Sequence, residues 1–214
     1  MTQILDTIAD KLYDGKHREI AALAQQALDE GLTAKHILDD GLIAGMNRVG
    51  QDFRDGVRYI PEVMLSAKTM NAALDVLRPL LAESGTPVAG KVVIGTVKGD
   101  IHDVGKKLVG IMLTGAGFQL IDLGCDVSPE RFVEAIQNEK PDLVGMSALL
   151  TTTMTQMKAT LQAMVAAGVR DKVKVLVGGA PVTEAYAEEI EADAYAPDAA
   201  SAVRKARFLI GLAV

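Results

Sequence analysis

The sequence has no tryptophan, and its few phenylalanines and tyrosines make up only 4% of the residues. Proteins that bind single-stranded nucleic acids stack bases on aromatic side chains, so a platform of this kind is not expected. Basic residues are also scarce, with 22 lysines and arginines against 28 aspartates and glutamates and a formal net charge of −6. Such an acidic chain repels phosphate backbones, which predicts that it has no nucleic-acid partner.

Cysteine occurs once, at Cys125, which excludes a disulfide within the chain. No apolar run reaches the ~18 residues that a membrane-spanning helix needs. Residues 1–16 read as an amphipathic helix and lack the basic start and apolar stretch of a signal peptide. These absences predict a cytoplasmic protein with no membrane partner.

The sequence is rich in hydrophobic residues, which make up 49% of its 214 residues and are enough to form a buried core. That length suits one large domain or two small ones. Within residues 1–82 the apolar positions recur at helical spacing, and in the longest pattern they step by three and four. The members of that pattern are Ile60, Val63, Ala67, Met70, Leu74, Leu77 and Leu81. We predict a bundle of four or five helices for this part of the chain.

The pattern of apolar residues changes after residues 83–90, a stretch of small residues and proline that is typical of a linker. Short apolar runs then alternate with helical patterns, which predicts a parallel sheet with helices on both faces. The strands are expected at 91–96, 118–123, 143–146, 173–177 and 194–195, and the helices at 104–116, 128–139, 153–167, 183–190 and 198–212. The predicted fold is therefore a helical domain, 1–85, followed by a five-stranded parallel Rossmann/flavodoxin-like α/β domain, 86–214.

Parallel sheets bind ligands beyond the carboxyl ends of their strands, so the loop after the first strand is a candidate site. This loop lacks both a G-x-G-x-x-G phosphate cradle and a Walker lysine, but it places Asp100 two residues before His102. A carboxylate at this spacing can bond one ring nitrogen while the other faces a metal. The alternative is a solvated or capping histidine. His17, His36 and Cys125 are dispersed, so a zinc site is not expected, whereas a single imidazole suits a metal held by a macrocycle.

Residues 99–106, Gly-Asp-Ile-His-Asp-Val-Gly-Lys, resemble the D-x-H-x-x-G signature of cobalamin-binding domains. Ser147-Ala148-Leu149 is similar to the S-x-L segment that follows the third strand in that family, and Gly178-Gly179 is similar to its GG after the fourth. Residues 45–67 resemble the helical cap that precedes the cobalamin domain in methionine synthase. Stand-alone corrinoid proteins of methyltransferase systems share this cap, and the resemblance covers nearly the whole chain.

The resemblance implies a role for each member of a short relay. His102 would coordinate cobalt as its lower axial ligand, and Asp100 would accept a hydrogen bond from the other ring nitrogen. Thr153 stands six residues after Ser147, where the family has a hydroxyl that completes the relay. These three are the implied catalytic residues, and His102 is the implied metal ligand.

The implied cofactor is cobalamin or a related corrinoid, with methylcobalamin in the loaded state. Its implied contacts are Gly99, Asp100, Ile101, His102, Asp103, Val104, Gly105, Ser147, Leu149, Thr151, Gly178, Gly179 and Ala199 in the α/β domain, and Met46, Phe53 and Ile60 in the cap. The alternative for the two glycines is an ordinary strand-to-helix turn. The alternative for Phe53 and Ile60 is the bundle core, and Met46 fits either position.

Two lysines directly follow the motif. Lys106 and Lys107 open the expected helix after the first loop, and we predict that both lie on solvated faces. Neither lysine belongs to the implied relay of His102, Asp100 and Thr153.

The resemblance implies a corrinoid methyl carrier, a component of a multi-protein methyltransferase rather than an enzyme that acts alone. Its partners would be a substrate-specific methyltransferase, an acceptor methyltransferase that uses tetrahydrofolate or coenzyme M, and a reductive activation protein. The alternatives are the small subunit of an adenosylcobalamin-dependent mutase and a cobalamin-binding regulatory module. The cap argues against the first, and residues 1–30, too short and acidic for a helix-turn-helix, argue against the second.

Overall fold

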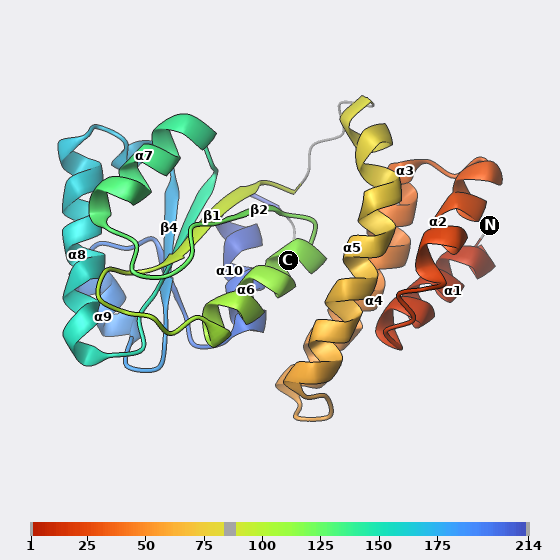
Figure 1. The fold of residues 1–214 in the computed structure, drawn as a ribbon, viewed down its shortest axis with the longest axis horizontal. Helices are drawn as coiled ribbons and strands as arrows, with labels where there is room; N and C mark the ends of the chain where they lie inside the picture. Colours follow the sequence, from red (N-terminus) through yellow and green to blue (C-terminus); the bar gives the residue numbers. More distant parts are fainter. Residues whose placement is uncertain (1, 84–88, 213–214) are drawn as a thin grey trace. The chain divides into compact units, whose positions relative to one another are not determined.

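A computed structural model describes residues 2–83 and 89–212 (Figure 1). The described residues divide into two compact units. The helical unit contains the residues up to 83 together with Thr114–Gly117, and the α/β unit contains Ala89–Leu113 and the residues from Phe118 onward. The expected linker at 83–90 lies mostly outside the described residues, so the boundary between residues 85 and 86 stays a prediction.

The helical unit confirms the expected bundle. Its elements are α1 (Thr2–Tyr13), α2 (Ile20–Asp29), α3 (Ala34–His36), the π-helical segment η1 (Ile37–Ile43), α4 (Ala44–Arg54) and α5 (Ile60–Glu83). Because α3, η1 and α4 follow one another without a break, these elements form four continuous helical segments. Val63, Met70 and Leu77 on α5 are fully buried, as the periodicity predicts, whereas Ile60 at its start is 39% exposed.

The α/β unit contains five parallel strands in the order β2-β1-β3-β4-β5. The strands are β1 (Lys91–Thr96), β2 (Gln119–Asp122), β3 (Leu143–Ser147), β4 (Lys174–Gly178) and β5 (Ala194–Ala196). The helices between and after them are α6 (Val104–Gly115), α7 (Pro129–Glu139), α8 (Thr151–Ala166), α9 (Glu184–Glu189) and α10 (Ala199–Leu209), with a short 3-10 helix, η2 (Arg170–Lys172), before β4. This strand order is the flavodoxin-like one, so the predicted fold class is confirmed.

Helices cover both faces of the sheet (Figure 1). On one face, α7, α8 and α9 pack against β1, β3 and β4 around Phe132, Met157 and Val144, which are fully buried. On the other face, α6 lies close to Ile94, and α10 contacts β4 and β5. Strands buried on both sides need apolar residues at successive positions, which explains why they appear in the sequence as short continuous apolar runs.

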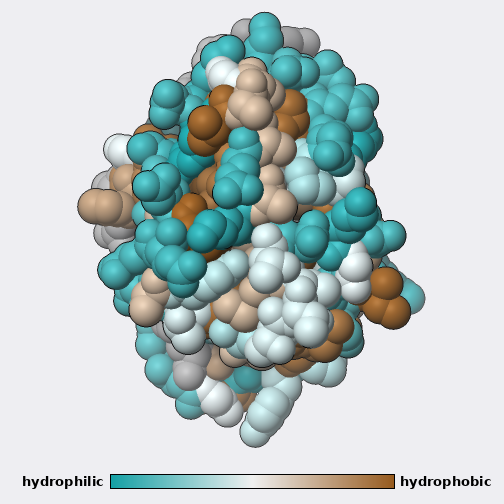
Figure 2. Space-filling model, turned by 90° about the vertical axis from the view of Figure 1, so that its left-hand side faces the viewer, coloured by the Kyte–Doolittle hydropathy of each residue, from teal (hydrophilic) through white to brown (hydrophobic). Residues whose placement is uncertain are grey.

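Among the residues that the structure describes, none of the helices combines the length and apolar character that crossing a bilayer requires. On the face over α7, α8 and α9, hydrophilic residues surround small, separate hydrophobic areas (Figure 2). Such scattered apolar residues are ordinary for a protein surface in water.

Two glycines allow the loops at the carboxyl edge of the sheet to approach closely. A Cβ atom on Gly179 would lie 1.9 Å from the carbonyl oxygen of Ala148, and one on Gly178 would lie 2.8 Å from that of Ala196. Gly179 also has a φ of +131°, which side-chain-bearing residues rarely adopt. The GG pair thus brings the loops after β3 and β4 into backbone contact.

Substituting alanine at Gly179 should therefore destabilise the protein. We expect Gly179→Ala to lower the free energy of unfolding by about 2 to 4 kcal/mol, because the new methyl group meets backbone that cannot rotate away and the φ angle is strained. Gly105→Ala is the control, since nothing lies within 4 Å of the added Cβ and the site is helical. Urea denaturation measures both, and equal midpoints for the two variants would contradict the expected close packing.

Candidate functional site

The candidate site lies where the strand order reverses. In the sheet, β2 lies on one side of β1 and β3 lies on its other side. The loop after β1 therefore leads to one side and the loop after β3 to the other, so the two loops diverge at the carboxyl edge. Open α/β sheets bind ligands in the crevice that such a reversal creates. Asp100 and His102 come from the loop between β1 and α6, and Thr153 comes from the first turn of α8.

The centre of the site is the carboxylate of Asp100, which is fully buried. One oxygen, Oδ1, accepts from the ring Nδ1 of His102 at 2.7 Å and from its backbone N–H at 3.0 Å. The other, Oδ2, accepts from the backbone N–H of Leu149 at 2.8 Å and of Leu150 at 3.3 Å, and from the hydroxyl of Thr153 at 2.8 Å. The two loops are therefore joined through one side chain.

These donors keep Asp100 ionised despite its burial. Burial alone raises the pKa of the Asp100 carboxyl, since it disfavours the charged form. Hydrogen bonds from the backbone of His102 and Leu149, from the His102 ring and from the Thr153 hydroxyl outweigh burial and hold that pKa well below its usual range. The site thus contains a fixed negative charge beside the imidazole.

The hydrogen bonds of His102 determine which ring nitrogen can meet a ligand. Because Nδ1 faces the Asp100 carboxylate, we assign the proton to Nδ1, which leaves the lone pair of Nε2 for a ligand. The backbone carbonyl of His102 accepts from the hydroxyl of Thr96 at 2.9 Å, which fixes the loop from the end of β1. The His102 side chain is nevertheless 46% exposed, so the imidazole is both oriented and accessible.

The surroundings of His102 test whether a corrinoid fits. Across residues 2–83 and 89–212, no three or more His, Cys, Asp and Glu side chains gather as metal ligands, so a metal at His102 would need its other ligands from elsewhere. A corrin ring supplies such ligands. Ile101 and Val104 beside His102, and Leu149 and Leu150 across from it, expose between 42% and 78% of their surface. Accessible imidazole among uncovered apolar side chains fits a large planar cofactor.

The other predicted contacts in the first loop have varied surroundings. Gly99 has a φ of +79°, Asp103 forms an ion pair with Lys107, and a Cβ atom added to Gly105 would meet nothing within 4 Å. Ser147 at the end of β3 accepts from the backbone N–H of Val97 at 3.0 Å through its carbonyl oxygen, which leaves its hydroxyl out of that bond.

The remaining predicted contacts lie on three further segments. Thr151 is exposed at the start of α8, and Ala199 is buried at the start of α10. Gly178 and Gly179 have the packing role described above, and their contact with a cofactor stays a prediction. In the helical unit the three predicted cap residues differ in burial. Met46 is buried, Phe53 is half-buried and Ile60 is exposed.

One expectation about the lysines was wrong. Lys106 is 4% exposed, and its ammonium group forms an ion pair with Asp122 at the end of β2. Asp122 also accepts from the backbone N–H of Gly124 at 2.9 Å. This pair joins the first turn of α6 to the end of β2, and it could be anticipated only by placing Asp122 at a neighbouring strand end. Lys107 is exposed, as predicted.

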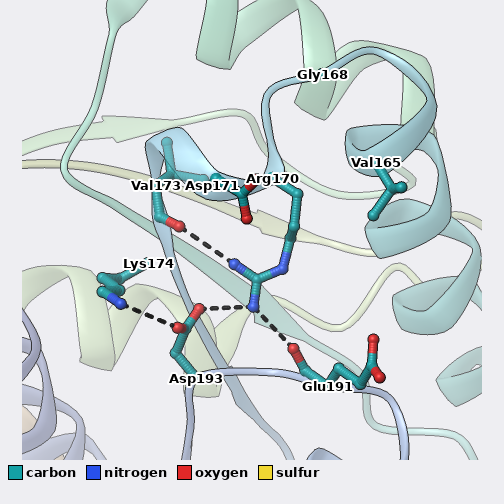
Figure 3. A pocket seen from close by; sticks show the side chains of 8 residues that line it. All are labelled: Val165, Gly168, Arg170, Asp171, Val173, Lys174, Glu191 and Asp193. Atoms are coloured by element: carbon teal, nitrogen blue, oxygen red, sulfur yellow. Dashed lines mark hydrogen bonds and ion pairs between the residues drawn. The ribbon is translucent and has the colours of Figure 1, made fainter.

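The structure also describes a cavity of about 460 Å³ at the amino ends of β4 and β5, the opposite edge of the sheet (Figure 3). The guanidinium of Arg170 lies between its walls and donates to the carbonyl oxygens of Val173 and Glu191. Arg170 and Lys174 both form ion pairs with Asp193. Because both basic side chains of this cavity pair with Asp193, we assign it to the packing of the strand ends, not to the candidate site.

Comparison with known proteins points to the same class of cofactor. Two family models, each described as a B12 binding domain, match residues 90–204 and residues 4–78. A corrinoid protein of Desulfitobacterium hafniense (strain Y51) is 41% identical over 211 residues, covering 97% of this chain and 98% of the relative. The dimethylamine corrinoid protein of Methanosarcina barkeri is 42% identical over 210 residues, with the same coverage.

Among solved structures, the methanol:cobalamin methyltransferase complex of Methanosarcina barkeri contains a chain that matches with a TM-score of 0.86 and 30% identity. The match covers 98% of this chain and 80% of that one. The chain therefore belongs to the family of corrinoid proteins built from B12 binding domains, and its cofactor is a corrinoid.

The network at Asp100 predicts a cost for removing the Thr153 hydroxyl. We expect Thr153→Val to lower the free energy of unfolding by about 1.5 to 3 kcal/mol, the usual range for a hydrogen bond to a charged group. Thr160→Val is the matched control. Its hydroxyl is also buried on α8 but donates only to Gln156 of the same helix. Urea denaturation without cofactor compares the two, and an equal loss in both variants would contradict a special role for Thr153.

Proposed function

We propose that this chain is a corrinoid methyl carrier, which accepts a methyl group from a substrate-specific methyltransferase and presents it to a second methyltransferase. The observation that carries the proposal is the accessible imidazole of His102, oriented by the buried charge of Asp100. A bound corrinoid supplies a cobalt centre that takes up and releases methyl groups. The protein supplies the ligand, its orientation and the surfaces on which partners dock.

Each predicted residue has a proposed part in this function. His102 would hold the metal through Nε2, while Asp100 fixes the ring and increases its basicity through Nδ1. Thr153 would act through Asp100, to which its hydroxyl donates. Residues 86–214 would form the cofactor-binding domain, with the tail of the cofactor between the loops that follow Ser147 and Gly178. Residues 1–85 would form the cap.

The relatives support methyltransferases as partners. They include a dimethylamine corrinoid protein and a member of the methanol:cobalamin methyltransferase complex. By analogy, one partner of this chain would be a methyltransferase for a methylamine or methanol. The acceptor enzyme would use tetrahydrofolate or coenzyme M, and a reductive activation protein would restore the cofactor after oxidation.

Ligation by His102 is testable by reconstitution. We expect the full chain to bind hydroxocobalamin at one site with the absorption spectrum of a histidine-ligated cobalt, and His102→Ala to lose that spectrum. His36→Ala is the control, because His36 is an exposed histidine in the helical unit. If His102→Ala kept the wild-type spectrum, or if wild type bound no cofactor, the assignment would be refuted.

Methyl transfer is tested with the reconstituted protein and candidate partners. Incubation with a methylamine- or methanol-specific methyltransferase and its labelled substrate should place one methyl group on each protein molecule. Tetrahydrofolate or coenzyme M, with the matching second enzyme, should then remove it. Stable uptake of an adenosyl group with no methyl uptake would support a mutase subunit instead.

A further inference from the structure

Asp126, in the loop between β2 and α7, contacts the polypeptide on both sides of the Asp100 α-carbon. Its carboxylate accepts from the backbone N–H of Gly99 at 2.7 Å. Its own backbone N–H donates to the carbonyl oxygen of Asp100 at 3.0 Å. One residue of a third loop thus bonds the Lys98–Gly99 peptide group and the Asp100–Ile101 peptide group, which lie on either side of the Asp100 α-carbon.

The β2–α7 loop runs beside the β1–α6 loop beyond the ends of the strands. Thr96 donates its backbone N–H to Gly124 and accepts one from Val127 through its carbonyl, and Val97 pairs with Val127 as an isolated parallel bridge. These bonds bring Asp126 alongside Gly99 and Asp100. The contact is therefore a continuation of the parallel pairing, with the Asp126 side chain taking part where the ladder ends.

The backbone of Asp126 has an unusual conformation at this contact. Its φ is +54°, a left-handed value that costs residues with a side chain roughly 1 kcal/mol or more and that Asp and Asn tolerate best. Gly99, its hydrogen-bond donor, has a φ of +79°. Such conformations persist where the surrounding structure overdetermines them, and they gather at functional sites.

The two bonds of Asp126 hold the Lys98–Gly99 and Asp100–Ile101 peptide groups, which flank the Gly99–Asp100 peptide. The Asp100 backbone N–H donates to Val97 at 3.1 Å within its own turn, whereas the bonds to Asp126 come from a separate segment. The carboxylate of Asp100 is fixed by His102, Leu149 and Thr153, but those bonds hold only if its main chain stays in place. Asp126 is thus well placed to determine the direction in which Asp100 presents its oxygens.

We propose that Asp126 is a positioning residue for His102: it fixes the main chain of Asp100, which in turn orients the imidazole that would ligate cobalt. The proposal rests on the proposed function for its purpose, but the orientation of the ring exists without a cofactor. Asp126 bonds the backbone of Gly99 and Asp100, and it acts on His102 through Asp100 alone.

Two variants of Asp126 separate its hydrogen bond from its backbone conformation. Asp126→Gly accepts the left-handed φ without strain but loses the acceptor for Gly99. Asp126→Asn tolerates the same φ and keeps an oxygen that can accept from Gly99. Asp142→Asn is the matched control, because Asp142 accepts the backbone N–H of Lys91 at 2.8 Å at the opposite edge of the sheet.

The first measurement uses the full chain without cofactor. We expect Asp126→Gly to speed hydrogen exchange of the Gly99 amide by about tenfold, in keeping with the loss of one net hydrogen bond. The NMR signal of the His102 Nδ1 proton, which depends on the bond to Asp100, should broaden or disappear. Asp126→Asn and Asp142→Asn should leave both signals as in wild type.

The second measurement adds hydroxocobalamin. Asp126→Gly should bind the cofactor while showing a smaller fraction of the histidine-ligated spectrum, and Asp126→Asn should restore that fraction. An unchanged Nδ1 signal and spectrum in Asp126→Gly would overturn the proposal, as would an equal loss in Asp126→Asn or Asp142→Asn. If wild type bound no cobalamin, the proposed function would fail, whereas the cofactor-free NMR comparison would still decide the role of Asp126.

Discussion

The buried negative charge of Asp100 is the constraint on which the site depends. A carboxylate removed from water is costly unless donors replace its hydration. Here the donors come from its own loop and from the β3–α8 segment, so the charge is stable only where both loops meet. The strand order brings these loops together at the reversal beside β1, and the glycine pair after β4 lets the neighbouring backbone approach. The fold therefore creates a place where an ionised carboxylate can be buried.

The same charge explains how a single histidine of this chain is oriented for a ligand. A neutral imidazole in solution exchanges its proton between two nitrogens and turns freely. With Nδ1 held against Asp100, the ring presents Nε2 and gains basicity from the adjacent carboxylate. The apolar side chains that flank it leave a surface that water solvates poorly. Orientation, basicity and an uncovered apolar rim thus come from a few residues at one edge of a sheet.

Sequence reasoning identified the parts of the site that depend on local spacing or on a family signature. The two-residue step from Asp100 to His102 was readable directly, and Thr153 followed from its distance to Ser147. Asp126 was missed and Lys106 was placed on a solvated face because their contacts depend on how β2 and the loop after it lie beside the β1–α6 segment, which no periodicity encodes. The helices of the bundle were readable from their apolar stripes, but the π-helical stretch at 37–43 was not, since it keeps the same apolar stripe.

The network around Asp100 also bears on the order in which the molecule is completed. Its partners Leu149, Leu150 and Thr153 stand 49, 50 and 53 residues further along the chain. Closing a loop of that length costs entropy that only later contacts recover, and parallel strands join slowly for the same reason. A growing or partly folded chain has the His102 motif without the support that aims it. We therefore expect fully folded molecules to bind the cofactor tightly and partly folded ones to bind it weakly.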